Sequence, residues 1–279
     1  MSTKRTRSAH RFRTGLLAAI FAVVALTPLG PSVLAYGNDR AAPHRPTIVL
    51  VHGAWAGPAG WGQVAAELRW DGYRVVIPAL GLADASADVA IVQTALDSIP
   101  GRKILVGHSY GGAVISQAAA GRTDVQALVY TAAFAPDEGE SLVDLGAGYA
   151  PPAAFAPDHL LFQGPPPLGP TTIDPAYFRN DFAQDLSPWR ASRLAAEQTP
   201  TNLGLFFAPS GPVAWHTLPS WYAISGADRM IDPALQKFMA QRMGATTVTF
   251  AGASHAGGFT RDAPRLVRLV ESAARATAG

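Results

Sequence analysis

Along most of this chain, the pattern of hydrophobic and polar residues predicts β-strands that alternate with α-helices. Short apolar runs rich in β-branched residues recur, as in strands buried within a parallel sheet. These runs are residues 47–51, 73–77, 104–106, 125–131, 221–225 and 246–250. Helical spacing of apolar residues lies at 63–70, 86–98, 113–118, 233–243 and 264–274. The alternation predicts an α/β fold whose parallel sheet has right-handed crossovers.

The alternation stops between residues 135 and 218, where 13 of the chain's 23 prolines lie. The same stretch is rich in aromatic residues: Phe155, Phe162, Tyr177, Phe178, Phe182, Trp189, Phe206, Phe207 and Trp215. Aromatic side chains at this density can bury enough apolar area to fold. We therefore expect these residues to form a cap inserted over the sheet, with helices at 175–183 and 188–197. The aromatics either line an apolar pocket or hold the cap together.

The first 35 residues have the three-part layout of a secretory signal peptide. Residues 1–13 are basic, residues 15–26 are apolar, and residues 33–35 offer small side chains at a cleavage site. The apolar run is short for a membrane span, so cleavage is favoured over a retained anchor. We expect a secreted or extracytoplasmic protein with no membrane contact after cleavage. Residues 36–46 form a flexible lead-in, and residues 47–279 form the folded domain.

The net charge of +2 does not describe the folded domain, because several basic residues lie at the start of the chain. Five of the 22 lie in the first 13 residues, which leaves 17 basic against 20 acidic residues in 36–279. This balance does not suggest a nucleic-acid surface. The chain has no cysteine, which excludes disulfides and zinc–thiolate sites.

One stretch combines a strand, a sharp turn and a helix around the pattern G-x-S-x-G. The apolar run 104–106 leads into Gly107, Ser109 and Gly111, and helical spacing resumes at once. This is the nucleophile elbow, in which glycines let strand and helix pass closely while the serine occupies a strained turn. The pattern predicts Ser109 as a nucleophile.

A second glycine-bearing loop follows the first predicted strand and reads His52, Gly53, Ala54. Hydrolases with this elbow place an oxyanion-hole amide there, and the other is the amide after the nucleophile. We therefore predict the N–H groups of Ala54 and Tyr110 as oxyanion donors, each lowering the barrier by roughly 3–4 kcal/mol. The alternative is an ordinary glycine-rich turn. We expect His52 and the histidine before the nucleophile, His108, to be structural.

Candidates for the acid and the base each follow a late strand. Asp228 comes after the run 221–225, and His255 lies in the loop after 246–250. The chain order serine, aspartate, histidine is that of this elbow class. Asp232 competes for the acid role, but it precedes a proline and suits the N-cap of the next helix.

From about residue 47 to residue 274 the chain resembles the α/β-hydrolase superfamily. The stretches 51–55 and 130–142 and the residue Gln236 resemble the branch that contains plant methylesterases, hydroxynitrile lyases and bacterial esterases. The resemblance implies a Ser109–His255–Asp228 triad with no cofactor and no metal. Two strands common at the start of the superfamily's sheet are missing, so we expect a mostly parallel six-stranded sheet with helices on both faces.

The resulting expectation is a serine esterase that cleaves small-molecule carboxylic esters through an acyl-enzyme. Ser109 argues against the dehalogenases and epoxide hydrolases of this fold, which use a carboxylate nucleophile. The branch's lyases carry a threonine and a lysine where this chain has Gly53 and Ala256. A lactonase or cofactor-free perhydrolase with the same triad, and a secreted ligand-binding protein without catalysis, remain open.

Overall fold

The computed structural model describes residues 45–164 and 169–278. The predicted signal peptide and nearly all of the lead-in therefore lie outside the described residues. Within the described part of the chain, no helix has both the length and the apolar character to cross a membrane.

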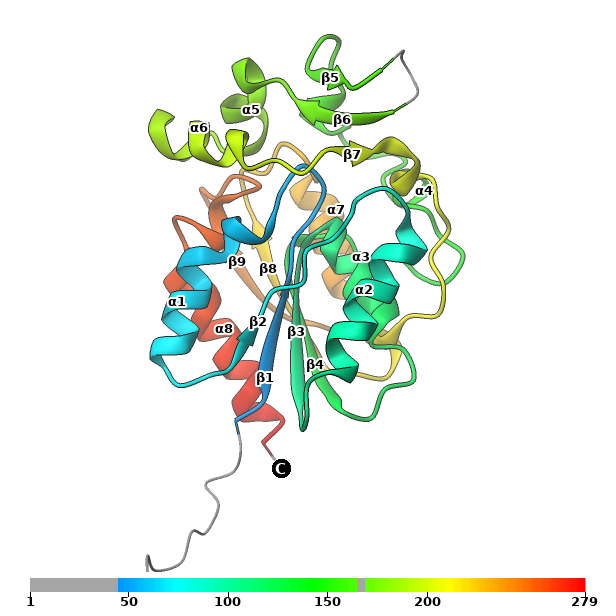
Figure 1. The fold of residues 1–279 in the computed structure, drawn as a ribbon, viewed down its shortest axis with the longest axis vertical. Coiled ribbons are helices and arrows are strands. Elements are labelled where there is room, and N and C mark those ends of the chain that lie inside the picture. The colour runs from blue at the N-terminus through cyan, green and yellow to red at the C-terminus, as the bar shows by residue number, and fades with distance from the viewer. Residues whose placement is uncertain (1–44, 165–168, 279) are drawn as a thin grey trace, which may run out of the picture. The chain divides into compact units, whose positions relative to one another are not determined.

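The centre of the molecule is a six-stranded sheet in which every neighbouring pair is parallel (Figure 1). The strand order is β2-β1-β3-β4-β8-β9. Their bounds are β1 Thr47–Val51, β2 Val75–Val76, β3 Lys103–Ser109, β4 Val125–Ala133, β8 Ser220–Ser225 and β9 Thr246–Phe250. The expected six-stranded α/β fold is confirmed. The predicted strand 73–77 shortens to two residues, because β2 lies at the sheet edge and pairs only with Ile48 and Val49 of β1.

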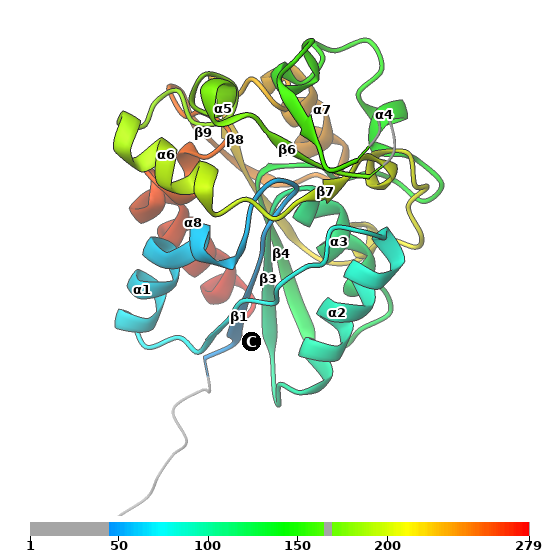
Figure 2. The same ribbon diagram turned by 45° about the horizontal axis from the view of Figure 1, so that its top comes forward.

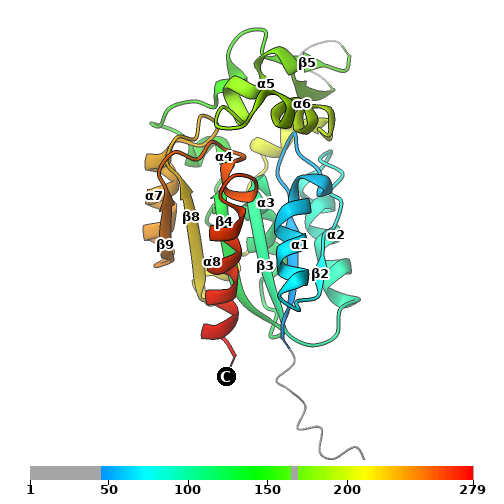
Figure 3. The ribbon, with the colours of Figure 1, turned by 90° about the vertical axis from the view of Figure 1, so that its left-hand side faces the viewer.

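Helices cover both faces of this sheet (Figure 3). Helices α1 (Gly62–Trp70) and α8 (Ala263–Ala276) pack together on one face, and α2 (Ala85–Asp97) and α3 (Tyr110–Ala118) pack together on the other. Helix α7 (Pro233–Arg242) packs against β8. All five lie within a few residues of the helices that the apolar spacing predicts.

The segment between β4 and β8, residues 134–219, leaves the central sheet. Most of it lies above the carboxyl ends of the strands, and its last part descends past α3 to the start of β8 (Figure 2). We call it the cap segment. It contains a three-stranded antiparallel sheet of β5 (Leu160–Phe162), β6 (Pro170–Ile173) and β7 (Thr201–Asn202). Its helices are α4 (Leu142–Leu145), α5 (Pro175–Phe182) and α6 (Pro188–Ala196). The sequence predicts α5 and α6 but not α4 or the strands. Each of the two predicted helices has a proline at its first position and an N-cap side chain before it.

Short 3₁₀ turns complete the described chain. They are η1 Pro58–Trp61, η2 Ala153–Phe155, η3 Leu203–Phe206, η4 Ala214–His216 and η5 Gly257–Phe259. Three of these five lie in the cap segment, so its backbone changes direction often.

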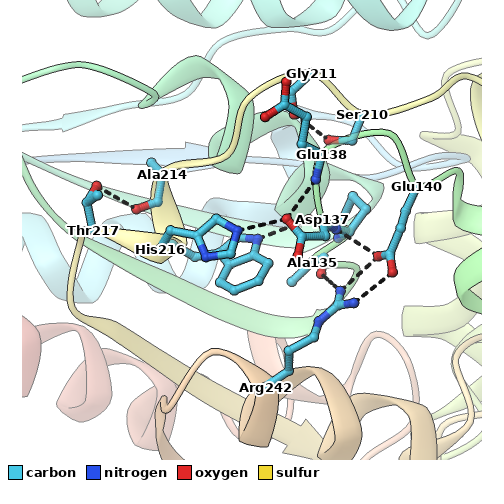
Figure 4. Close-up of polar contacts among 12 residues, drawn as sticks. Ala135, Asp137, Glu138, Glu140, Ser210, Gly211, Ala214, His216, Thr217 and Arg242 are labelled. Atoms are coloured by element: carbon cyan, nitrogen blue, oxygen red, sulfur yellow. Dashed lines mark hydrogen bonds and ion pairs between the residues drawn. The ribbon is translucent and has the colours of Figure 1, made fainter.

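The two ends of the cap segment are tied to each other and to α7 (Figure 4). Arg242 donates to both carboxylate oxygens of Glu140, at 2.8 and 2.9 Å, and to the Ala135 carbonyl at 2.7 Å. At the returning end, His216 Nε2 lies 2.8 Å from Asp137 Oδ1. Partial burial is the largest single influence and raises the pKa of Glu140. The hydrogen bond and charge of Arg242 and the Asp137 amide together outweigh it, so the net pKa is lowered. This ion pair fixes where the cap segment leaves the sheet.

Candidate active site

Ser109 lies where β3 ends and α3 begins, in a backbone conformation that residues other than glycine rarely adopt. Its φ is 55° and its ψ is −129°, and it is buried. A non-glycine residue at positive φ is strained and persists only where its surroundings fix it. The elbow glycines supply that packing. A Cβ on Gly111 would lie 2.5 Å from the Val51 carbonyl oxygen, and one on Gly107 would lie 2.7 Å from the Gly111 oxygen.

The loop after β1 lies directly against this serine. A Cβ on Gly53 would lie 2.5 Å from Ser109 Cβ and 3.1 Å from Ser109 Oγ, so only glycine fits. The peptide unit that joins Gly53 to Ala54 is oriented by His52, whose Nδ1 lies 3.0 Å from the Gly53 oxygen. His52 Nε2 accepts the Leu80 amide at 3.0 Å, which leaves the proton on Nδ1. Burial lowers the pKa of His52, so the ring is a neutral brace.

Tyr110 follows the serine and starts α3. Its hydroxyl donates to Asp88 Oδ2 at 3.1 Å, and the other oxygen of Asp88 accepts the amides of Gly81 and Leu82. Burial and the neighbouring Asp88 carboxylate raise the pKa of Tyr110 well above its usual value. The Tyr110 side chain is therefore a neutral donor that fixes the first turn of α3. Asp88 was not predicted, since a lone aspartate within a helical pattern gives no signal.

His255 and Asp228 form a buried pair. His255 Nδ1 lies 2.8 Å from Asp228 Oδ2, and Asp228 Oδ1 accepts the amides of Met230 and Ile231 at 2.7 and 3.1 Å. A carboxylate at Nδ1 holds the proton there and leaves Nε2 as an acceptor. That Nε2 atom is buried, and no residue of the described chain bonds to it. His255 therefore has one nitrogen bonded to a carboxylate and the other free to accept a proton.

Gln236 holds the carboxylate from the other side. From α7 it donates to Asp228 Oδ2 at 2.8 Å and to the Ile231 carbonyl at 2.9 Å, while its oxygen accepts the Ser225 amide at 2.9 Å. The side chain is fully buried. In the sequence, Gln236 stands out only through the family resemblance. A glutamine on the buried face of the helix after the acid is the signal that points to this role.

His108, which precedes Ser109 on β3, contacts His255 and holds its loop beside this strand. Its ring centroid lies 4.5 Å from that of His255, and its Nε2 lies 3.0 Å from the His255 carbonyl oxygen. The rings of Phe182 and Phe259 pack against it. Burial, with His255 beside it, lowers the pKa of His108 well below its usual value. His108 is thus neutral, and its Nε2 is engaged with the His255 backbone.

Asp232, the competing acid, faces elsewhere. Its Oδ1 caps α7 by accepting the Ala234 amide at 2.8 Å, and its Oδ2 accepts the Ala150 amide at 3.1 Å. The structure therefore places Asp228, and not Asp232, against His255.

A cavity of about 430 Å³ lies between residues of the cap segment and the start of α7, and Ser109, Asp228 and His255 do not themselves line it. One wall is Phe134, whose amide donates to the Ser109 carbonyl at 3.0 Å, and another is Met230, whose amide donates to Asp228. The larger apolar side chains around it are Phe134, Leu142, Val143, Tyr149, Phe155, Phe206, Phe207, Met230, Ile231 and Leu235. The size is typical of small-molecule sites, and the lining favours a neutral, apolar ligand group. In the part of the chain that the structure describes, no cluster of metal-binding side chains occurs.

Comparisons with known proteins agree with this architecture. A carbendazim-hydrolysing esterase from Nocardioides sp. (strain SG-4G) is 38% identical over 122 residues, which span 39% of this chain and half of that esterase. A pyrethroid hydrolase from Sphingobium faniae JZ-2 superposes with a TM-score of 0.69 at 25% identity, covering 84% of this chain and 98% of that structure. A methylesterase from Arabidopsis, 18% identical, shares the fold with a TM-score of 0.66 over 81% of this chain and 99% of its own.

The sequence model of the alpha/beta hydrolase family matches residues 48–268, which include the central sheet and the cap segment. The chain therefore belongs to the α/β-hydrolase family.

Proposed function

We propose that this protein is a serine esterase that hydrolyses small-molecule carboxylic esters. Ser109 is the nucleophile, His255 the general base, and Asp228 the group that orients and stabilises the histidine. The amides of Ala54 and Tyr110 form the oxyanion hole. The observation that carries the proposal is the His255 ring: its Nδ1 is bonded to a buried carboxylate and its buried Nε2 is left free. The His255 loop also contacts His108, the residue before the strained serine.

Each catalytic step follows from that arrangement. His255 Nε2 takes the Ser109 proton as Oγ attacks the ester carbonyl, and the two amides stabilise the negative oxygen that forms. The protonated ring then gives its proton to the departing alcohol, which leaves an acyl group on Ser109. Water attacks that acyl group with His255 again as the base, and the carboxylic acid and the free serine result.

The cavity supports an ester with an apolar portion. Its lining is mostly hydrocarbon and aromatic, and it adjoins both the serine strand and the aspartate loop. The comparison proteins named for hydrolysing carbendazim and pyrethroids are consistent with substrates of this kind.

Replacing Ser109 with alanine removes the nucleophile. For Ser109→Ala we expect kcat/KM on p-nitrophenyl butyrate to fall at least about a thousandfold, with the melting temperature retained. A fluorophosphonate probe should label the natural protein and the control Ser98→Ala, which changes an exposed serine at the end of α2. Labelling or full esterase activity in Ser109→Ala would contradict the assignment.

Asparagine substitutions at Asp228 and Asp232 test which aspartate is the acid of the triad. Asp228→Asn keeps the side-chain shape but loses the charge that stabilises protonated His255, so kcat should fall by roughly 10⁴-fold. Asp232→Asn keeps an N-cap of similar strength but loses the acceptor for the Ala150 amide at the cavity wall, so its effect should fall on KM while kcat stays within about twofold. Steady-state kinetics on one ester compare them, and equal losses in both variants would refute the choice of Asp228.

Substrate chain length tests the cavity. From p-nitrophenyl acetate to butyrate to octanoate, kcat/KM should rise by up to about fourfold for each methylene that the cavity buries. Ala147→Phe narrows the cavity and should reduce this gain while activity on the acetate is retained. Ala66→Phe, on the exposed side of α1, is the control. A preference for acetate in the natural protein would show that the cavity does not hold the acyl chain.

A further inference from the structure

Trp55, the residue after the proposed oxyanion donor Ala54, adopts an unusual backbone conformation. Its φ is 51°, in the left-handed region that a bulky side chain occupies only when its surroundings impose it. The side chain is buried. The surroundings that impose this conformation belong to the cap segment.

Two threonines of the cap segment accept hydrogen bonds from Trp55. Its backbone N–H donates to Thr201 Oγ1 at 2.8 Å, and its indole N–H donates to Thr171 Oγ1 at 3.1 Å. Both threonines are fully buried, on the antiparallel strands β7 and β6. In Figure 2, β7 crosses above the loop that follows β1.

The hydroxyl protons of these threonines are already committed. Thr201 donates to the Thr199 carbonyl at 3.1 Å, and Thr171 donates to the Thr201 carbonyl at 2.9 Å. A hydroxyl has one proton, so both oxygens present only lone pairs to Trp55. The bonds therefore run in one direction, from Trp55 into the cap segment.

The indole ring is held as well. Phe206 stacks on Trp55 with centroids 5.4 Å apart, and Phe155 meets it edge-on at 6.0 Å. Both phenylalanines also line the cavity. The tryptophan thus lies between the proposed oxyanion loop and the wall of the proposed substrate site.

We propose that Trp55 is a positioning residue through which the cap segment completes the oxyanion hole. The two peptide units that flank Ala54 are fixed from opposite sides. His52 holds the carbonyl of the first, which carries the Ala54 N–H, and Thr201 holds the N–H of the second. With both planes fixed, the Ala54 N–H keeps its direction before substrate arrives. The cap segment then acts on the rate of the chemical step as well as on substrate choice. This inference rests on the proposed serine esterase activity.

The isosteric variant Thr201→Val removes the acceptor for the Trp55 amide. We expect kcat on p-nitrophenyl butyrate to fall about ten- to a hundredfold while KM stays within about threefold, because the loss falls on the transition state. The inhibition constant of a trifluoromethyl ketone, which forms an oxyanion on the serine, should rise in parallel with the loss of kcat. Thr201→Ser keeps the hydroxyl and should recover most of the activity.

The control is Thr217→Val, which removes an exposed cap hydroxyl remote from Trp55 and should leave kcat and KM unchanged. If Thr201→Val does not fold, Thr171→Val is measured in the same way, with a smaller loss of kcat expected. A rise in KM at unchanged kcat, or a serine variant no better than valine, would overturn the inference. Fluorophosphonate labelling of the natural protein distinguishes failure of this inference from failure of the proposed function. Absence of labelling would refute the esterase assignment itself.

Discussion

The site depends on one tight crossing, where the end of β3, the start of α3 and the loop after β1 meet with no space for side chains. Glycine at 107, 111 and 53 allows that contact, and each added Cβ would overlap a backbone or serine atom. Ser109 is held at positive φ by this packing, so its hydroxyl stands at the carboxyl edge of the sheet. In parallel α/β sheets that edge is where ligands bind. The proposed oxyanion loop is part of the same packed unit.

Around this crossing, buried polar groups hold the proposed catalytic residues in place by hydrogen bonds. Burial lowers the pKa of His52 and His108, so both stay neutral and serve as hydrogen-bonding braces. Asp228 is buried with His255, and a buried charge persists only when it is well bonded. Two backbone amides, the Gln236 amide and the imidazole meet that need. The geometry of the proposed base therefore depends on residues that never touch the substrate.

Much of this could be predicted from sequence where the signal is local. The bounds of β1 and β9 match the predicted runs. Ser109 is the last residue of a strand that the pattern identifies, and Asp228 and His255 follow two others. Asp232 was recognised as an N-cap because a proline follows it. Long-range contacts left no such signal. The cap strands β6 and β7 are short and pair across about thirty residues of chain, and Trp55 reaches Thr201 across 146 positions. Neither arrangement alters a local pattern.

The most direct test is a crystal structure of the protein after reaction with a fluorophosphonate ester. The account predicts phosphorus bonded to Ser109 Oγ, a phosphonyl oxygen about 3 Å from the amides of both Ala54 and Tyr110, and His255 Nε2 facing the bonded oxygen. Phosphorus on another residue, or a phosphonyl oxygen turned away from both amides, would contradict it.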